Sequence, residues 1–365
     1  MLHEVVAVAF LVATGSVSAS PTLKAGCTVS NYDDVAGAVS SCTEIVIKDM
    51  TVPAGKALDM SLKSGTKLTF QGKISFAKSN WEGPLIQIKG SKLTVQGASG
   101  HVLDGQGQLY WDGKGSSGTK KPKFFRIKAT GGSVFKDINL LNCPVQCVSI
   151  NSASDLTVSG FNIDVSAGDS GDLGHNTDGF DISSSNNIVV KDSVVKNQDD
   201  CVAVNQGSNM VFQNLDCSGG HGLSLSVGFD DNDASKNTVK NVTFTDSSVK
   251  NSRNGIHVKT HSDSGPGLIQ DVTYKNIKLS NIERYGINVQ EDYEDGSSSG
   301  NAKGNIPIKN LRMNSVTGTM TGSNSIAVYI LCGSGGCSSW NWDGVNITGN
   351  KKSNSCNFSV TGFKC

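Results

Sequence analysis

The sequence is short of net charge, of proline and of membrane-spanning apolar runs. Its 365 residues include 32 basic and 32 acidic side chains, giving no formal net charge, and seven prolines. Binding to nucleic acid or to a membrane surface needs a basic stripe, so neutrality argues against both partners. Beyond the N-terminal segment, no apolar run is long enough to span a bilayer.

Metal-binding patterns are missing as well. No CxxC pair or histidine doublet has the spacing of a zinc site. The acidic run Asp230–Asp233 lacks the glycine and the closing glutamate of an EF-hand loop, so a solvated loop is favoured over a calcium site. We therefore expect neither a metal nor a cofactor.

The N-terminus has the order of a secretory signal. An apolar run at Val5–Ala13 is followed by the small residues Val17–Ala19, which is typical of a signal peptide and its cleavage site. We therefore predict a signal peptide over residues 1–19. The mature chain, residues 20–365, is expected to be secreted and extracellular.

Ten cysteines fit a secreted protein, because disulfides persist in oxidising compartments. They fall into five local pairs: Cys27 with Cys42, Cys143 with Cys147, Cys201 with Cys217, Cys332 with Cys337, and Cys356 with Cys365. The sequence does not fix their connectivity. Cys143 and Cys147 can equally be small buried side chains, whereas the other four pairs are expected as disulfides. Three N-x-S/T sequons, at Asn241, Asn346 and Asn357, predict a glycosylated surface.

A short apolar motif repeats along the chain. Two apolar residues separated by one position recur as Val148/Ile150, Phe180/Ile182, Val202/Val204, Leu223/Leu225, Ile256/Val258 and Ile287/Val289. In a strand such a pair points to one side, toward a core. Helix-period spacing is absent and β-branched residues dominate the apolar positions. A β-sandwich would give hairpin turns rather than a phase-locked repeat.

We therefore predict a single-domain, all-β, right-handed parallel β-helix, with residues 27–50 capping its N-terminal end. Polar residues stand two positions before the apolar pairs, at Gln146, Asp178, Asp200, His221, Asn254 and Tyr285. If each repeat is one coil, these residues form a ladder on an outer face, with rungs roughly 4.7–4.9 Å apart. Asp178 and Asp200 share this phase and can hold one water between them, whereas Asp199 is out of phase and is expected to point elsewhere.

Three short motifs around these polar residues resemble those of a known family. Asn176–Asp178 reads NTD, Asp199–Asp200 reads DD and Gly220–Gly222 reads GHG, and together they resemble the polygalacturonases, a family of glycoside hydrolases. The segments Gln290–Tyr293 and Cys332–Cys337 are similar to that family too. The likeness covers nearly the whole mature chain. It implies hydrolysis of the α-1,4 bonds of polygalacturonate with inversion at the anomeric carbon.

The resemblance also implies roles for individual residues. Inverting hydrolysis needs one carboxylic acid to protonate the leaving oxygen and a carboxylate base to activate water. By resemblance Asp199 is the acid, which must stay protonated, and Asp178 and Asp200 form the base pair. His221 is expected to set the proton balance of the acid. The expected substrate-binding residues are Asn176, His257, Lys259 and Tyr293.

One position departs from the family. Where the family has Arg-Ile-Lys, this chain has His257-Val258-Lys259, and the literal Arg-Ile-Lys at Arg126–Lys128 lies on the wrong coil. Histidine binds a carboxylate by charge only when protonated, so binding through His257 is expected to be strongest at mildly acidic pH. Arg253, just before the strand, is a partial substitute.

The sequence as a whole predicts a secreted, monomeric endo-polygalacturonase acting on polygalacturonate, the backbone of pectin. A catalytically weak or inactive galacturonan-binding relative is one alternative. Another pectin-backbone hydrolase, such as an exo-polygalacturonase or a rhamnogalacturonan hydrolase, is the second. A calcium-dependent lyase is disfavoured, because nothing in the sequence asks for a metal.

Overall fold

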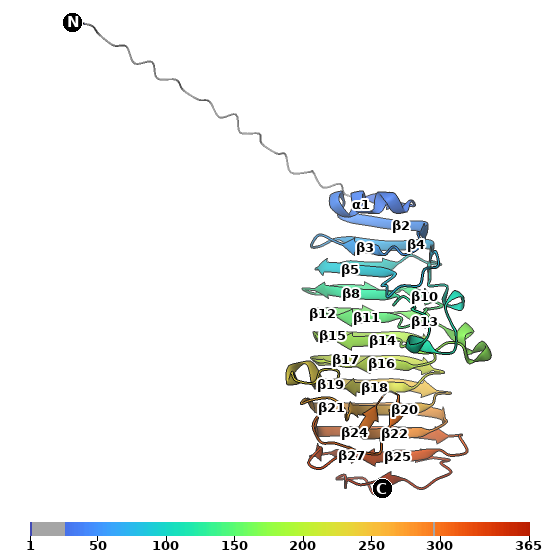
Figure 1. Cartoon of the computed structure of the whole chain (residues 1–365), viewed down its shortest axis with the longest axis vertical. Coiled ribbons are helices and arrows are strands. Elements are labelled where there is room, and N and C mark those ends of the chain that lie inside the picture. The colour runs from blue at the N-terminus through green and yellow to red at the C-terminus, as the bar shows by residue number, and fades with distance from the viewer. Residues whose placement is uncertain (2–25, 295) are drawn as a thin grey trace.

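Parallel strands stack into a long column of coils (Figure 1). The computed structural model describes Met1 and residues 26–294 and 296–365, so the predicted signal peptide lies almost entirely outside the described residues. No helix in these described segments is long and apolar enough to cross a membrane. The chain forms the right-handed parallel β-helix that the sequence predicts.

Two sets of strands run along the column. The first, which carries the predicted apolar pairs, contains β3 (Leu58–Ser61), β5 (Ile86–Ser91), β8 (Phe125–Thr130), β11 (Val148–Asn151), β14 (Phe180–Ser183), β16 (Asp200–Val204), β18 (Gly222–Val227), β20 (Asn254–His261), β22 (Tyr285–Glu294), β25 (Ile326–Leu331) and β29 (Ser355–Cys356), with β23 (Ser297–Ser298) antiparallel to β22. Register keeps equivalent residues in line: Ile150, Ile182 and Val204 lie opposite one another in β11, β14 and β16. All three are fully buried, so the repeat read from the sequence is the core-facing row of this sheet.

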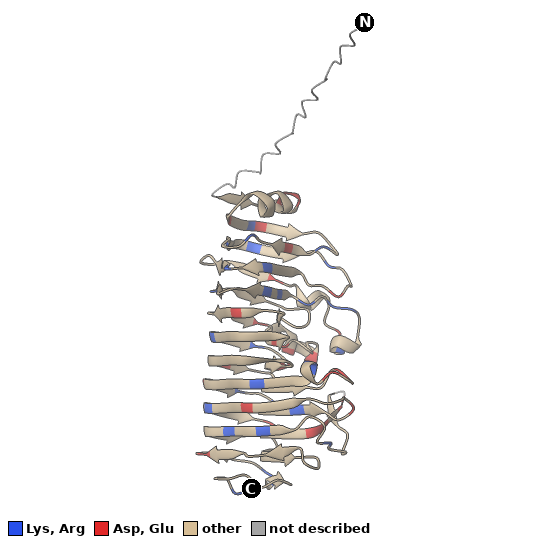
Figure 2. Ribbon diagram, turned by 90° about the vertical axis from the view of Figure 1, so that its left-hand side faces the viewer, with Lys and Arg blue, Asp and Glu red and all other residues tan. Residues whose placement is uncertain are grey.

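The second set covers the remaining faces. It contains β1 (Cys27–Val29), β2 (Glu44–Val52), β4 (Lys67–Phe76), β6 (Thr94–Gly97), β7 (Val102–Asp104), β9 (Ser133–Lys136), β10 (Asn139–Leu141), β12 (Ser154–Ser159), β13 (Asn162–Asp164), β15 (Ser185–Lys196), β17 (Gly207–Ser218), β19 (Thr238–Lys250), β21 (Leu268–Ile282), β24 (Ile308–Met320), β26 (Cys337–Ser338), β27 (Asn341–Asp343) and β28 (Asn346–Thr348). Figure 2 shows acidic and basic residues interspersed along this column rather than gathered into a stripe of one sign.

Aromatic side chains stack inside the column. The Phe212 and Phe244 rings lie 4.7 Å apart and nearly parallel, and Phe244 and Tyr274 lie 4.6 Å apart. They come from the successive strands β17, β19 and β21, so the coil repeat itself sets the ring spacing. Stacked aromatic pairs add roughly 0.5–1.5 kcal/mol beyond their area burial. This packed interior fixes the coils that carry the polar residues of the predicted ladder.

Asparagines form a second stack, at equivalent positions within the successive strands β15, β17 and β19. Asn187, Asn209 and Asn241 all have a left-handed backbone, which asparagine tolerates better than most residues. The Nδ2 of Asn241 donates to the Oδ1 of Asn209 at 2.8 Å, so one predicted glycosylation site belongs to this ladder. A second, Asn357, donates its Nδ2 to the carbonyl oxygen of Cys332. Glycosylation of these asparagines and of Asn346 stays a prediction.

The N-terminal end is covered and stapled. The helix α1 (Val35–Ser41) and β1 lie over the first coil, in the segment predicted as a cap, and a disulfide joins Cys27 of β1 to Cys42, which directly follows α1. Such a cover shields the open strand edges of a solenoid.

The remaining cysteines are paired locally as well. The other four disulfides of the described chain join Cys143 with Cys147, Cys201 with Cys217, Cys332 with Cys337, and Cys356 with Cys365. The four pairs expected as disulfides are therefore all bonded, and so is the pair whose state the sequence left open. The bond between Cys201 and Cys217 links β16 to β17, directly beside the DD motif. The bond between Cys356 and Cys365 ties the end of the chain to β29.

Candidate active site

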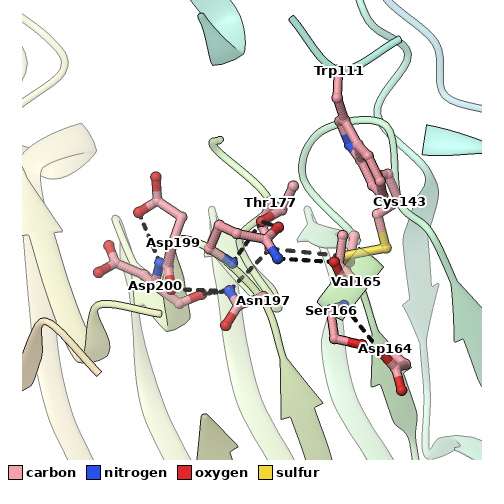
Figure 3. Close-up of a disulfide and its surroundings, with 11 residues drawn as sticks. Trp111, Cys143, Asp164, Val165, Ser166, Thr177, Asn197, Asp199 and Asp200 are labelled. Carbon is pink, nitrogen blue, oxygen red and sulfur yellow. Dashed lines mark hydrogen bonds between the residues drawn. A yellow bond between two sulfur atoms is a disulfide. The ribbon is translucent and has the colours of Figure 1, made fainter. Parts of the chain in front are cut away.

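The pair Asp199–Asp200 is held in place by a buried amide. Asn197, 2% exposed, donates from Nδ2 to the carbonyl oxygens of Thr177, Asp199 and Asp200 at 2.9–3.0 Å. Figure 3 shows this asparagine between the two aspartates and Thr177. Because these bonds link the turn before β16 to the turn before β14, the two acidic motifs are fixed relative to each other.

Hydrogen bonds to the preceding coil support these turns. The Nε2 of Gln198 donates to the carbonyl oxygen of Val165, and the hydroxyl of Thr177 donates to the Oε1 of Gln198. Close by, Trp111 donates its Nε1 to the carbonyl oxygen of Cys143, next to the Cys143–Cys147 disulfide (Figure 3). Hydrogen bonds to neighbouring segments therefore hold the acidic motifs in place.

The predicted ladder placed His221 opposite Asp200, but the structure does not. Asp200 pairs with Gly222, and the register then shifts before Val202 pairs with Leu223. The backbone N–H of His221 instead donates to the carbonyl oxygen of Asp199 at 2.8 Å. This irregularity moves His221 by one residue relative to the apolar pair, and it sets His221 opposite Asp199.

Asp199 does not point away from the other acidic groups, contrary to our expectation. Asp178, Asp181, Asp199 and Asp200 line one hollow of the groove, which we name the acidic hollow. Asp199 also borders an adjoining hollow, lined with His221, Arg253 and Arg284, which we name the basic hollow. Asp199 thus stands where the two hollows meet.

The Asp199 carboxylate is heavily hydrogen-bonded. Its Oδ1 lies 3.0 Å from the Nδ1 of His221, and its Oδ2 accepts from the Nδ2 of Asn176 at 3.2 Å. Burial alone would raise the pKa of Asp199, but the bond and charge of His221, with the charge of Lys259, lower it to about 2. Burial alone would lower the pKa of His221, yet its bond and attraction to Asp199 raise that pKa above 6.5. These opposite shifts favour an ionised Asp199 paired with a protonated His221 in the free protein.

On the other side of the acidic hollow, the surroundings favour protonated carboxyl groups. Burial raises the pKa of Asp178 well above its usual range, and the negative charge of Asp181 adds to the shift. The neighbouring Asp199 and Asp200 act in the same direction. Asp181 itself was missed in the sequence: burial raises its pKa to about 7, against the opposing charge of Lys123.

Lys259 supplies the balancing positive charge. Its Nζ lies 2.9 Å from the Oδ2 of Asp200, and both side chains are less than a tenth exposed. The other Asp200 oxygen accepts from the hydroxyl of Ser224 at 2.6 Å. The ammonium also lies over the ring of Tyr293, 4.9 Å from its centre, as a cation–π contact.

Asp199, Asp200 and His221 are close enough to share a metal ion, but their chemistry does not suit one. Their ligand atoms lie within 4.8 Å of one another. However, Lys259 already forms an ion pair with Asp200, and the Nδ1 of His221 is already bonded to Asp199; the raised pKa of His221 also favours the protonated ring, which has no lone pair to donate. The second candidate group, Glu291 with Cys332 and Cys337, has its two sulfurs bonded to each other.

His257 lies in the basic hollow, and its surroundings disfavour the charge that we expected it to carry. It is 7% exposed, and its Nε2 lies 3.2 Å from the Oε1 of Gln290. Burial, followed by the charge of Lys259, lowers the pKa of His257 well below 6.5. A neutral ring cannot attract a carboxylate by charge. The literal Arg-Ile-Lys at Arg126–Lys128 lies in β8, two strands before β14, so it does not replace this position either.

Comparison with known proteins agrees with this geometry. The model of the glycosyl hydrolases family 28 matches residues 42–365. The chain belongs to this family. It is therefore a glycoside hydrolase, as the NTD, DD and GHG motifs predicted.

Individual relatives share nearly the full length of this family 28 chain. A polygalacturonase from Phaedon cochleariae is 53% identical over 368 residues, covering 100% of both chains. Endopolygalacturonase I from Aspergillus niger is 45% identical over 343 residues, covering 93% of this chain and 91% of its own. The structure of endopolygalacturonase I from Stereum purpureum, complexed with two galacturonates, matches with a TM-score of 0.81 and 34% identity, over 93% and 99% of the two chains.

Proposed function

We propose that this glycoside hydrolase is a secreted, monomeric endo-polygalacturonase that cleaves the α-1,4 bonds of polygalacturonate with inversion. One observation carries the proposal: Asp178, Asp199 and Asp200 from neighbouring coils meet at the junction of two hollows, where Asp199 contacts His221. The relatives named as endopolygalacturonases support the same substrate and mode of attack.

In this proposal the Asp199–His221 pair acts as the proton donor. The 3.0 Å contact lets the two groups share one proton, and the raised pKa of His221 retains that proton to higher pH than a free imidazole would. As the bond to the leaving sugar breaks, the proton moves from His221 to Asp199 and from Asp199 to the departing oxygen, which leaves Asp199 ionised and His221 neutral. The pair titrates as a unit, so a low pKa for the Asp199 carboxyl is compatible with a donating role.

Asp178 and Asp200 hold and deprotonate the attacking water on the opposite side of the sugar. An inverting site needs roughly 6.5–9.5 Å between acid and base to make room for that water. The water oxygen bonds to the anomeric carbon, and its proton passes to one of the two carboxylates. Lys259 keeps Asp200 in place, with its Nζ at 2.9 Å, while water is activated.

The pKa shifts give the direction of the pH dependence. Asp178 must be ionised to act as a base, so activity is lost as pH falls through its raised pKa. The His221 proton must be present, so activity is also lost as pH rises through the raised pKa of His221. Both limbs of the resulting bell-shaped profile are therefore displaced upward from the ordinary values of about 3.9 and 6.5.

Product analysis over time tests this function against its alternatives. Demethylated polygalacturonate is incubated with the purified protein, and reducing ends and product lengths are followed. An endo-acting hydrolase releases oligomers of intermediate length early, whereas an exo-acting enzyme releases short end products from the start. No new reducing ends would indicate a binding relative, and unsaturated, ultraviolet-absorbing products would indicate a lyase. Either of these two results would contradict the proposed hydrolysis.

Localisation and assembly belong to the same proposal. The predicted signal peptide over residues 1–19, followed by the mature chain over 20–365, fits a chain whose ten cysteines are all disulfide-bonded in the described structure. Expression with the native N-terminus, followed by N-terminal sequencing of the medium, tests secretion and the cleavage site. Size-exclusion chromatography with light scattering tests the monomer.

A further inference from the structure

Two arginines line the basic hollow from successive coils. Arg253 directly precedes β20 and Arg284 directly precedes β22, where Asn254 pairs with Tyr285. The backbone N–H of Arg284 donates to the carbonyl oxygen of Arg253 at 2.8 Å. The two residues thus occupy equivalent positions on neighbouring coils, about 4.8 Å apart along the groove.

Arg253 and Arg284 are both exposed residues. Neither forms an ion pair with an acidic residue anywhere in residues 26–294 or 296–365. The guanidinium of Arg284 lies over the ring of Tyr285, 5.0 Å from its centre, which steadies it at the groove wall. Like charges on adjacent rungs repel, and an anion bound between them relieves that repulsion. The arrangement is therefore suited to a carboxylate.

The position of Asp199 indicates which part of a substrate meets these arginines. Asp199 borders both hollows, but Asp178, Asp181 and Asp200 border the acidic hollow rather than the basic one. The proton donor must face the oxygen of the departing segment, while the water must be held on the other side of the cleaved bond. The departing segment therefore lies in the basic hollow.

We propose that Arg253 and Arg284 bind the carboxylates of the galacturonan segment that departs on cleavage, and that they set the preference for non-esterified units there. This inference rests on the proposed function. His257, which is buried and bonded to Gln290, lines the same hollow. Arginine is permanently charged and presents a fork that matches a carboxylate, so this contact does not fade with pH as a histidine contact would.

The test compares Arg253→Gln, Arg284→Gln and the double variant on demethylated polygalacturonate. We expect KM to rise about fivefold for each single change and about 25-fold for the double, with kcat changed less than about twofold. The increase in KM should be smaller in 0.5 M salt, where the Debye length is about 4 Å, because screening weakens exposed charge pairs. Arg312→Gln is the matched control, since this exposed arginine lies on β24, in the other sheet, and should leave KM unchanged.

A double variant that keeps the wild-type KM at low salt would overturn the inference, as would an increase that salt does not reduce. If the double variant fails to fold, the single variants decide by the same criterion. A wild-type protein that releases no reducing ends would overturn the proposed function instead. In that event, calorimetric titration of the same variants with an oligogalacturonate of defined length still tests the binding role of the two arginines. Unchanged affinity of the variants would overturn that role.

Discussion

The two hollows of the groove differ in charge although they belong to the same repeating sheet. In the acidic hollow, crowding and burial raise the pKa values of Asp178 and Asp181. In the basic hollow, Arg253 and Arg284 stand exposed beside a neutral histidine. A polyanionic substrate gains charge-based affinity from the second hollow and undergoes chemistry at its border with the first. The groove therefore separates binding from catalysis along its length.

The largest expected effect comes from removing the group at the border. Asp199→Asn should lower kcat by about 10²–10⁴-fold, because the amide cannot donate the proton as an acid does. Substrate affinity and folding should be nearly unchanged, since the amide keeps the shape of the side chain. Kinetics together with calorimetric binding measure both quantities. Retention of more than about a tenth of wild-type activity would remove Asp199 from the donor role.

Lys259 joins the two hollows, so its loss should damage both stability and turnover. Lys259→Met leaves the Asp200 carboxylate buried without its cation, which costs roughly 3–5 kcal/mol in unfolding free energy. Urea denaturation measures this loss. Lys309→Met, at an exposed lysine of β24, is the control and should change stability by less than about 0.5 kcal/mol. Equal stability of the two variants would contradict the assigned countercharge.

Asp181 offers a way to change the acidic hollow alone. Asp181→Asn removes a negative charge that helps raise the pKa of Asp178, so that pKa should fall. The base then stays ionised to lower pH, and the acidic limb of the kcat/KM profile should move to lower pH. The limb set by His221 should stay in place. An acidic limb that stays fixed or moves upward would show that Asp181 does not tune the base.

The smallest effect is expected at His257. Because this ring is buried and neutral, His257→Gln should leave the pH dependence of KM unchanged between about pH 5 and 8. The absolute KM should change by less than about threefold, as the glutamine can still bond to Gln290. A wild-type KM that rises through pH 6.5, with the rise abolished in the variant, would instead assign the charged contact to His257.

Most of the fold and the centre of the site could be predicted from the sequence. The apolar pairs repeat in phase, and that phase alone places Asp178 and Asp200 on neighbouring coils. The position of His221 could not be predicted, because the register shift between Asp200 and Val202 leaves no mark in the residue pattern.

Burial could not be read from the repeat either. Asp181 lies between the two core residues of β14, where an outward side chain would normally be solvated. Its raised pKa arises from the three-dimensional surroundings of the groove. The same holds for His257, whose lowered pKa follows from its burial and from the nearby charge of Lys259. Charge states set by tertiary contacts require the structure.

The stereochemistry of the first product tests the central claim most directly. A water held by Asp178 and Asp200 attacks from the side opposite the leaving group, so each α-linkage should yield a β-anomer. Proton NMR of the reaction in its first minutes, before mutarotation, measures this ratio. Early accumulation of the β-anomer is the predicted result, and early accumulation of the α-anomer would contradict inversion and the division of roles between the two hollows.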